Sequence, residues 1–319
     1  MIMEKLSTVL IENQDRYEKG LLLPQIPPIK SVRVVKPIKL KVKAKKKVAA
    51  SAGIMMKNGL NDVLNAYDHF FENQSDPEGV HQVRVRIRKF RALLAFFRPL
   101  FKAENYLIQQ DTLRRMGQQF GEVRQLDVLL DGLSEIEKNS AIEITALAKV
   151  KAHLHGKREV AFERLLSDLE SDTFALDLLD IWVWKLNDPW QVGAPFFQLS
   201  LTDYTTGQID KWLKKIKKSM TNLDLKDQQA VHQVRIKSKK LRYVIEQLSV
   251  VLDKKTRKSM DAFERIQDDL GDYHDVFANQ HLLEQLVSES ADCQLHYEAG
   301  IIVGWQMMDG NQKMKKFSK

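Results

Sequence analysis

The chain has 319 residues, of which 44% are hydrophobic and 29% charged, as in a soluble globular protein with one large domain or two smaller ones. Its apolar runs are far shorter than the roughly 20 residues of a membrane span. Its single cysteine excludes an intrachain disulfide and a zinc site built on several thiolates. The net charge of +8 arises within residues 1–50, which hold 12 basic and 4 acidic residues, whereas residues 51–319 hold 38 of each sign. An anion site in that larger part must therefore come from the arrangement of its charges.

Residues 1–50 are predicted to form a basic, flexible N-terminal segment. The stretch 29–47 contains no acidic residue, and prolines at positions 24, 27, 28 and 37 interrupt regular structure. A strand or a docked arm is the alternative interpretation. The first 20 residues include acidic side chains and lack the pattern of a signal peptide, so we expect a cytoplasmic protein.

The rest of the chain shows helical periodicity almost everywhere, and it lacks the alternating β-branched runs and hairpin signals of a sheet. We therefore predict an all-α fold. The expected helices span about residues 54–73, 77–98, 103–135, 140–169 and 172–187, and then 203–221, 227–252, 255–289 and 291–317. The stretch DPWQVGAP at 188–195 is predicted to connect the two groups.

Two segments of eleven residues are nearly the same. HQVRVRIRKFR at 81–91 and HQVRIKSKKLR at 232–242 are 151 residues apart, and RRMGQQFGEVRQLDVLL at 114–130 resembles ERIQDDLGDYHDVFANQ at 264–280 at an offset of 150. Two matches at nearly one offset indicate an internal duplication. We predict a first helical repeat at 51–190 and a second at 196–319, related by pseudo-two-fold symmetry.

Each of the two segments places its basic residues in one stripe on the expected helix. At about 100° per residue, the stripe falls within an arc of about 80° and flanks the apolar face that must meet a core. The first stripe consists of His81, Arg84, Arg88 and Arg91. The second stripe consists of His232, Arg235, Lys239 and Arg242. Cations beside an apolar face lie at the edge of a helix interface, where a groove can form.

Four like charges on one helix face repel one another unless an anion is bound. Arginine recognises phosphate oxygens in a bidentate manner, and a histidine near a helix N-terminus can donate a hydrogen bond to phosphate. A solvated basic face is the alternative for the stripes, and a hydrogen bond to a neighbouring helix is the alternative for the histidines. The spacing of a helical metal site is absent, and no nucleophile, acid pair or phosphate loop suggests catalysis. We therefore expect a protein that is not an enzyme and needs no cofactor or metal.

These motifs resemble those of the CHAD domain, an α-helical family named for its histidines. The resemblance rests on DPEGVHQVRVRIRKFRALLAFF followed by FGEVRQLDVLL, and on VHQVRIKSKKLRY followed by LGDYHDV, and it covers about residues 51–319. One departure is visible: where the family usually has Arg-Asp-x-Asp, this chain has Arg124, Gln125, Leu126 and Asp127.

The resemblance implies two antiparallel four-helix bundles with a basic central groove or pore. It also implies binding of inorganic polyphosphate and association with polyphosphate granules. By position, both stripes would contact the polymer. Arg124, Arg158 and Lys218 are further, weaker candidates.

The alternative hypothesis is a nucleic-acid-binding protein that uses the basic N-terminal segment and the groove. Aromatic residues interleaved with the cations would favour base stacking, and the first stripe has none, while Tyr243 lies beside the second.

Overall fold

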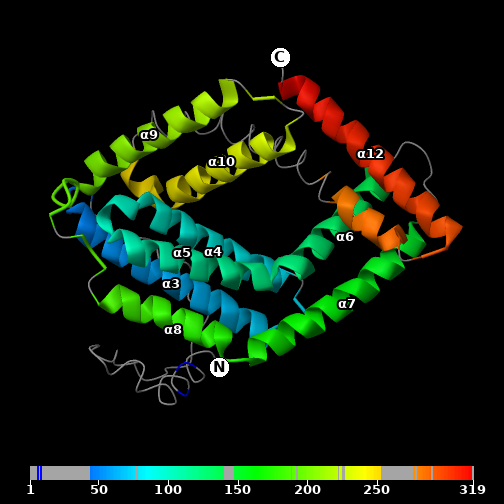
Figure 1. Cartoon of the computed structure of the whole chain (residues 1–319), viewed down its shortest axis with the longest axis horizontal. Coiled ribbons are helices and arrows are strands. Elements are labelled where there is room, and N and C mark those ends of the chain that lie inside the picture. The colour runs from blue at the N-terminus through cyan, green and yellow to red at the C-terminus, as the bar shows by residue number, and fades with distance from the viewer. Residues whose placement is uncertain are drawn as a thin grey trace. The chain divides into compact units, whose positions relative to one another are not determined.

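The computed structural model describes residues 6, 8, 44–76, 78–139, 147–187, 189–191, 193–221, 223–224, 227–252, 276, 279–288 and 290–317. Within these ranges the chain forms α-helices and short 3-10 turns and no β-strand (Figure 1), which confirms the predicted all-α class. Most of the predicted N-terminal segment, and most of the helix expected at 255–289, lie outside the described residues. The described end of the N-terminal segment is part of the fold, since helix α3 begins at Val48.

The chain divides into two compact units, each built from separate stretches. The first unit contains Met1–Gly121, Leu165–Trp212 and Tyr243–Asp253. The second contains Glu122–Arg164, Leu213–Arg242 and Lys254–Lys319. Each unit thus takes residues from both predicted sequence repeats, so the division near 190–196 does not separate the compact units. The duplication itself, and its two four-helix bundles, stay predictions.

Helices α3 (Val48–Glu72) and α4 (Glu78–Phe96) pack against each other in the first unit. Their buried apolar residues recur every three or four positions, as in α4 at Val83, Ile87 and Phe90. A Cβ atom at Gly59 would lie 2.6 Å from the Phe90 ring, so glycine lets the two helices approach closely. Helix α4 begins where the carboxylate of Asp76 accepts a hydrogen bond from the Glu78 amide at 2.9 Å.

Helices α5 (Ala103–Gln119) and α8 (Thr173–Leu186) pack together in the same unit. Aromatic rings fill the core: Phe174 stacks on Tyr67 at 4.4 Å between centroids, and Phe120 meets the edges of Phe70 and Phe174. The predicted connector follows α8 and is confirmed as one. There Trp190 stacks on Phe101 at 5.0 Å.

One predicted helix was wrong. The helix expected at 103–135 is divided into α5 and α6 (Gly121–Asn139) at Phe120. Phe120 is completely buried in the aromatic cluster, and its backbone angles, φ −83° and ψ 9°, end α5. The cluster that holds this ring is built from distant segments, so local periodicity did not reveal the break.

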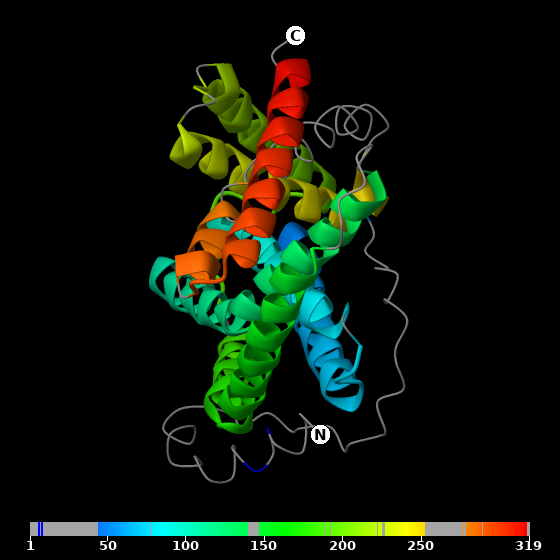
Figure 2. The ribbon, with the colours of Figure 1, turned by 90° about the vertical axis from the view of Figure 1, so that its right-hand side faces the viewer.

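In the second unit, polar contacts join α7 (Ala148–Glu170) to α6 and to the residues around the start of α12 (Cys293–Phe317). The ribbons of these helices are shown in Figures 1 and 2. The carboxylate of Glu298, which is 2% exposed, accepts a hydrogen bond from the Val150 amide at 2.9 Å and so caps α7. Lys149 lies 2.6 Å from Asp292. Apolar residues of α6 complete the core at the same spacing as in α4: Val123, Leu126, Leu129, Leu133 and Ile136.

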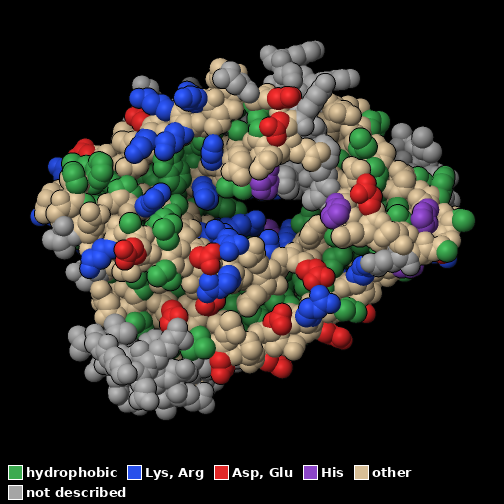
Figure 3. Space-filling model, viewed as in Figure 1, with side chains coloured by type: hydrophobic (Ala, Val, Ile, Leu, Met, Phe, Trp, Pro, Cys, Tyr) green, Lys and Arg blue, Asp and Glu red, His purple; other side chains and the backbone are tan. Residues whose placement is uncertain are grey.

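Helices α9 (Leu201–Thr221) and α10 (Gln228–Leu248) contribute residues to both units. At the start of α9, the buried Tyr204 hydroxyl donates to the carbonyl of Phe96 at 2.8 Å and satisfies the end of α4. Near the end of α9, Lys and Arg side chains gather on the surface in view (Figure 3). Among the described helices, none has an apolar stretch sufficient to cross a membrane.

Candidate anion-binding site

The first stripe lies on α4, in the first unit. His81, Arg84, Arg88 and Arg91 are all half-buried, and the adjoining face of α4 is fully buried at Val83, Ile87 and Phe90. The stripe therefore lies at the edge of the helix interface, as the sequence predicts. Its charges are partly removed from water.

The other cations of α4 lie near acidic residues. Nζ of Lys89 is 2.7 Å from Oε2 of Glu246, which belongs to the part of α10 in the same unit. Burial raises the pKa of Asp62 on α3, and the positive charges of Arg86 and Lys89 offset part of that rise. Lys89 is therefore ion-paired, and Arg86 lies near the carboxyl group of Asp62.

Arg88 and Arg91 of the stripe differ from Arg86 and Lys89 in their surroundings. Their Nε atoms are buried and have no hydrogen-bond partner in the described part of the chain, and neither guanidinium forms an ion pair there. Burial and, next, the positive charge of Arg114 lower the pKa of Arg91, while Tyr106 and Asp111 offset part of this effect. A half-buried cation without an acidic partner is partly desolvated, and an added anion would relieve that cost.

Arg84 is fixed by the end of α5. Its Nη1 donates a hydrogen bond to the carbonyl of Gly117 at 2.8 Å. A Cβ atom at Gly121 would lie 3.3 Å from the same nitrogen, so the glycine leaves room for the guanidinium. The carbonyl end of α5 suits a cation because the helix dipole is negative there.

His81 has an acidic neighbour that the eleven-residue motif does not contain. Its Nε2 lies 3.9 Å from Oε1 of Glu78, which is in the first turn of α4. Glu78 also accepts a hydrogen bond from Gln82 at 2.7 Å. A bound anion at His81 would therefore have a negative charge one turn away.

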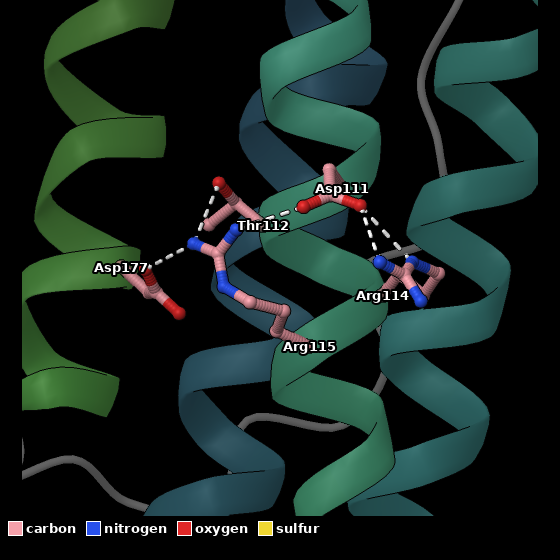
Figure 4. A network of polar contacts seen from close by, with 5 residues as sticks. All are labelled: Asp111, Thr112, Arg114, Arg115 and Asp177. Carbon is pink, nitrogen blue, oxygen red and sulfur yellow. Dashed lines mark hydrogen bonds and ion pairs between the residues drawn. The ribbon is translucent and has the colours of Figure 1, made fainter.

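The site region also includes a network of charges on α5 (Figure 4) that the stripe analysis missed. Asp111 accepts hydrogen bonds from Arg114 at 2.7 Å and from Arg115 at 2.9 Å. Arg115 also reaches Asp177 of α8 at 3.0 Å. Arg115 is thus shared between two carboxylates, whereas Arg114 has one and lies close enough to Arg91 to lower its pKa. The consecutive arginines in RRMG were the available signal in the sequence.

The second stripe lies on α10, in the second unit. His232, Arg235, Lys239 and Arg242 are half-buried beside the buried residues Val231, Val234 and Leu241. The stripe has the same position relative to its core as the first one. The two stripes belong to different compact units.

The three weaker candidates also lie in the second unit. Nη1 of Arg124 is 3.9 Å from Asp131. Nε of Arg158 donates to the buried carboxylate of Asp127 at 2.5 Å, and its guanidinium lies over the Phe162 ring. Lys218 is exposed on α9. Arg158 therefore forms an ion pair with Asp127, whereas the side chain of Lys218 is exposed to solvent.

The comparison with known families decides what kind of protein this is. The family model of the CHAD domain matches residues 59–284. The chain belongs to the CHAD domain family.

Solved structures agree with this fold. The crystal structure of the CHAD domain from the plant Ricinus communis is 22% identical with a TM-score of 0.71, and the match covers 86% of this chain and 91% of that one. PptA from Streptomyces chartreusis is 15% identical with a TM-score of 0.64, and the match covers 86% of this chain and 98% of that one. No curated protein matches this CHAD protein. In the described residues, no group of three or more His, Cys, Asp or Glu could hold a metal ion.

Proposed function

We propose that this CHAD protein binds inorganic polyphosphate through the two cationic stripes and does not catalyse a reaction. The observation that carries the proposal is the state of Arg88 and Arg91, whose buried Nε atoms have no partner in the described residues. The neighbouring Lys89 on the same helix does have an acidic partner, Glu246. Membership of the CHAD family, which is associated with polyphosphate binding, supports the same ligand.

The shape of the stripe suits a linear polymer. Residues 81 to 91 extend over about 15 Å along α4 at 1.5 Å per residue, so several phosphates can lie beside them. Arginine forks recognise phosphate oxygens well, and polyphosphate carries no base that the protein would have to accommodate. Release of counterions from the polymer would make the affinity depend strongly on salt.

The cellular setting is part of the proposal. Binding to long polyphosphate would place the protein in the cytoplasm at polyphosphate granules. The basic groove or pore that the family resemblance implies remains a prediction.

Nucleic acid is the second candidate ligand, because phosphate backbones attract the same cations. Base stacking would need exposed aromatic residues among the cations. Tyr243, beside the second stripe, is buried, and Lys89 lies over its ring at 5.9 Å. This residue is therefore not available as a stacking platform.

A competition experiment tests the proposal. Labelled long-chain polyphosphate is bound to the full chain at physiological salt and then displaced by unlabelled polyphosphate, single-stranded RNA or duplex DNA at equal phosphate concentration. We expect polyphosphate to displace the label at the lowest concentration. Equal or better displacement by a nucleic acid would favour the second candidate, and no binding of the label would refute the proposal.

A further inference from the structure

The end of α9 carries a second cluster of cations that neither stripe includes. We define the α9 lysine surface as Lys214, Lys215, Lys217 and Lys218 of α9 together with Lys237 of α10. All five side chains are exposed and belong to the second unit. Blue side chains gather over this helix in Figure 3.

These lysines occupy the side of α9 opposite its core. At about 100° per residue, the four of α9 lie within an arc of about 160°. Leu213, Ile216 and Met220 lie on the other side, and Ile216 is fully buried. No acidic residue occurs from Lys211 to Thr221. A merely solvated helix face usually mixes both signs of charge, because pairs four residues apart then stabilise the helix.

The α9 lysine surface is also absent from the first repeat. Helix α3 precedes the first stripe as α9 precedes the second, and their buried positions coincide at an offset of 149 residues. The buried residues Met55, Met56, Gly59 and Leu60 correspond to the buried residues Tyr204, Thr205, Gln208 and Ile209. At this offset, the four lysines of α9 correspond to Asn65, Ala66, Asp68 and His69. The lysines are thus specific to one half of the chain.

The surface lies on a different side of α10 from the second stripe. Nζ of Lys237 donates to Oγ of Ser219 on α9 at 3.0 Å, which identifies the side of α10 that faces α9. On the helix, Lys237 is about 160° from the stripe residues Arg235 and Lys239. The α9 lysine surface is therefore separate from the stripe.

We propose that the α9 lysine surface is a second binding site for polyphosphate, separate from the stripes. This inference rests on the proposed function. Lysines are mobile point charges that attract phosphate without the planar geometry of arginine. The four lysines of α9 lie within about 6 Å along the axis. Phosphates joined only by bridging oxygens present charge more densely than nucleotides, whose phosphates are separated by sugars, and so fit this surface better.

Lysine footprinting on the full chain tests this site directly. The protein is acetylated with and without long-chain polyphosphate, and modification is measured at each lysine by mass spectrometry. We expect at least threefold protection of the α9 lysines and of Lys239 in the stripe, and little protection of the exposed residues Lys57 and Lys102. Protection of the α9 lysines should persist in the Arg235→Gln/Arg242→Gln variant, because the stripe is a different site.

A pair of charge-matched variants provides the second measurement. One carries Lys214→Gln, Lys215→Gln, Lys217→Gln and Lys218→Gln, and the control carries Lys46→Gln, Lys57→Gln, Lys102→Gln and Lys138→Gln. We expect only the first variant to lose affinity for long polyphosphate. The slope of its log affinity against log salt concentration should become shallower by about 0.7 per lost contact.

The outcomes separate the two proposals. Protection of Lys239 without protection of the α9 lysines would overturn the second site and leave the proposed function standing. Equal losses in both charge-matched variants would also overturn it, because they would reflect net charge alone. Equal protection by single-stranded DNA at the same phosphate concentration would overturn the choice of polyphosphate. No protection anywhere, with no binding, would overturn both proposals.

Discussion

Arg84 of α4 donates a hydrogen bond from Nη1 to the carbonyl of Gly117 at 2.8 Å, so a cation of the stripe is held by the end of a neighbouring helix. The contact orients one side of the guanidinium toward α5. The position of the guanidinium depends on the space beside Gly121, where an added Cβ atom would lie 3.3 Å from Nη1 of Arg84. The packing of α4 on α5 and the orientation of this site residue are therefore linked.

Gly121→Ala should weaken polyphosphate binding several-fold by displacing the Arg84 guanidinium. The fold should tolerate the change, because the added Cβ atom meets only the end of a flexible side chain. Polyphosphate titration and thermal unfolding of the variant measure the two effects. Gly156→Ala is the control, since nothing lies within 4 Å of its Cβ position in the interior of α7. That variant should gain about 0.5–1 kcal/mol of stability and bind normally. Unchanged affinity of Gly121→Ala would remove the link between the glycine and the site.

The double variant Arg88→Gln/Arg91→Gln should lower polyphosphate affinity by tenfold or more. Hydrogen bonds to charged groups contribute about 1.5–3 kcal/mol each, and both half-buried guanidinium groups lack an acidic partner in the described residues. The slope of log affinity against log salt should become shallower by about 0.7 per lost contact. Fluorescence titration at several salt concentrations measures both effects.

The matched control for this variant is Arg86→Gln/Lys89→Gln, which removes the same charge from the same helix. These cations lie near Asp62 and Glu246, so their loss should change affinity by less than threefold. If the control lost as much affinity as the stripe variant, the site would depend on the net charge of α4 and not on its unpaired arginines.

The Glu298→Ala variant should lose about 1–3 kcal/mol of stability, because it leaves the buried Val150 amide without an acceptor. The loss should appear in denaturant unfolding followed by a probe in the second unit, for example the fluorescence of Trp305. Glu163→Ala, an exposed change on α7, should stay within about 0.5 kcal/mol of wild type. Equal unfolding of the two variants would show that water replaces the lost cap.

A chain that begins at residue 44 should bind polyphosphate, whereas the shorter chain beginning at 51 should be less stable. Three backbone hydrogen bonds tie residues 44–48 to the start of α9: Val48 to Leu199, Leu201 to Lys46 and Thr202 to Ala44. Circular dichroism reports the stability and titration reports the binding. If the chain from 44 folds but does not bind while a peptide of residues 29–47 does, the binding site is the basic segment and not the stripes.

The stripes themselves could be predicted from the sequence, because helical periodicity fixes which side chains share a face. The position of both stripes at the edge of a helix interface followed from the apolar residues beside them. Which cations remain unpaired could not be predicted. Lys89 and Glu246 are far apart in the sequence, and only the packing of α10 on α4 brings them together.

The sequence also did not predict which stretches of the chain form each compact unit. Repeats at one offset indicate duplicated segments, but they do not specify which helices pack together. The buried ring of Phe120 divides a helix that looked continuous, and Asp127 engages Arg158, which position alone suggested as a ligand-binding residue. Each of these depends on contacts between distant segments.

The last prediction concerns the histidines at the start of each stripe. If His81 and His232 contact bound phosphate, the charged imidazolium is favoured in the complex, and proton uptake accompanies binding. Affinity should therefore strengthen as the pH falls from about 8 to about 6, the range in which imidazole ordinarily titrates. Arginine and lysine remain charged across this range, so the dependence should belong mainly to histidine.

Titration calorimetry in buffers of different ionisation enthalpy measures this proton uptake. It should fall in the His81→Gln/His232→Gln variant, since glutamine donates hydrogen bonds without titrating. Glu78→Gln is the informative companion variant, because Glu78 lies 3.9 Å from His81 and competes with the ligand for its charge. Its removal should raise the affinity for polyphosphate at pH 6 and increase the number of protons taken up. Identical pH profiles in the wild type and the double histidine variant would leave the arginines and lysines as the whole of the site and assign the histidines to the structure of the helix ends.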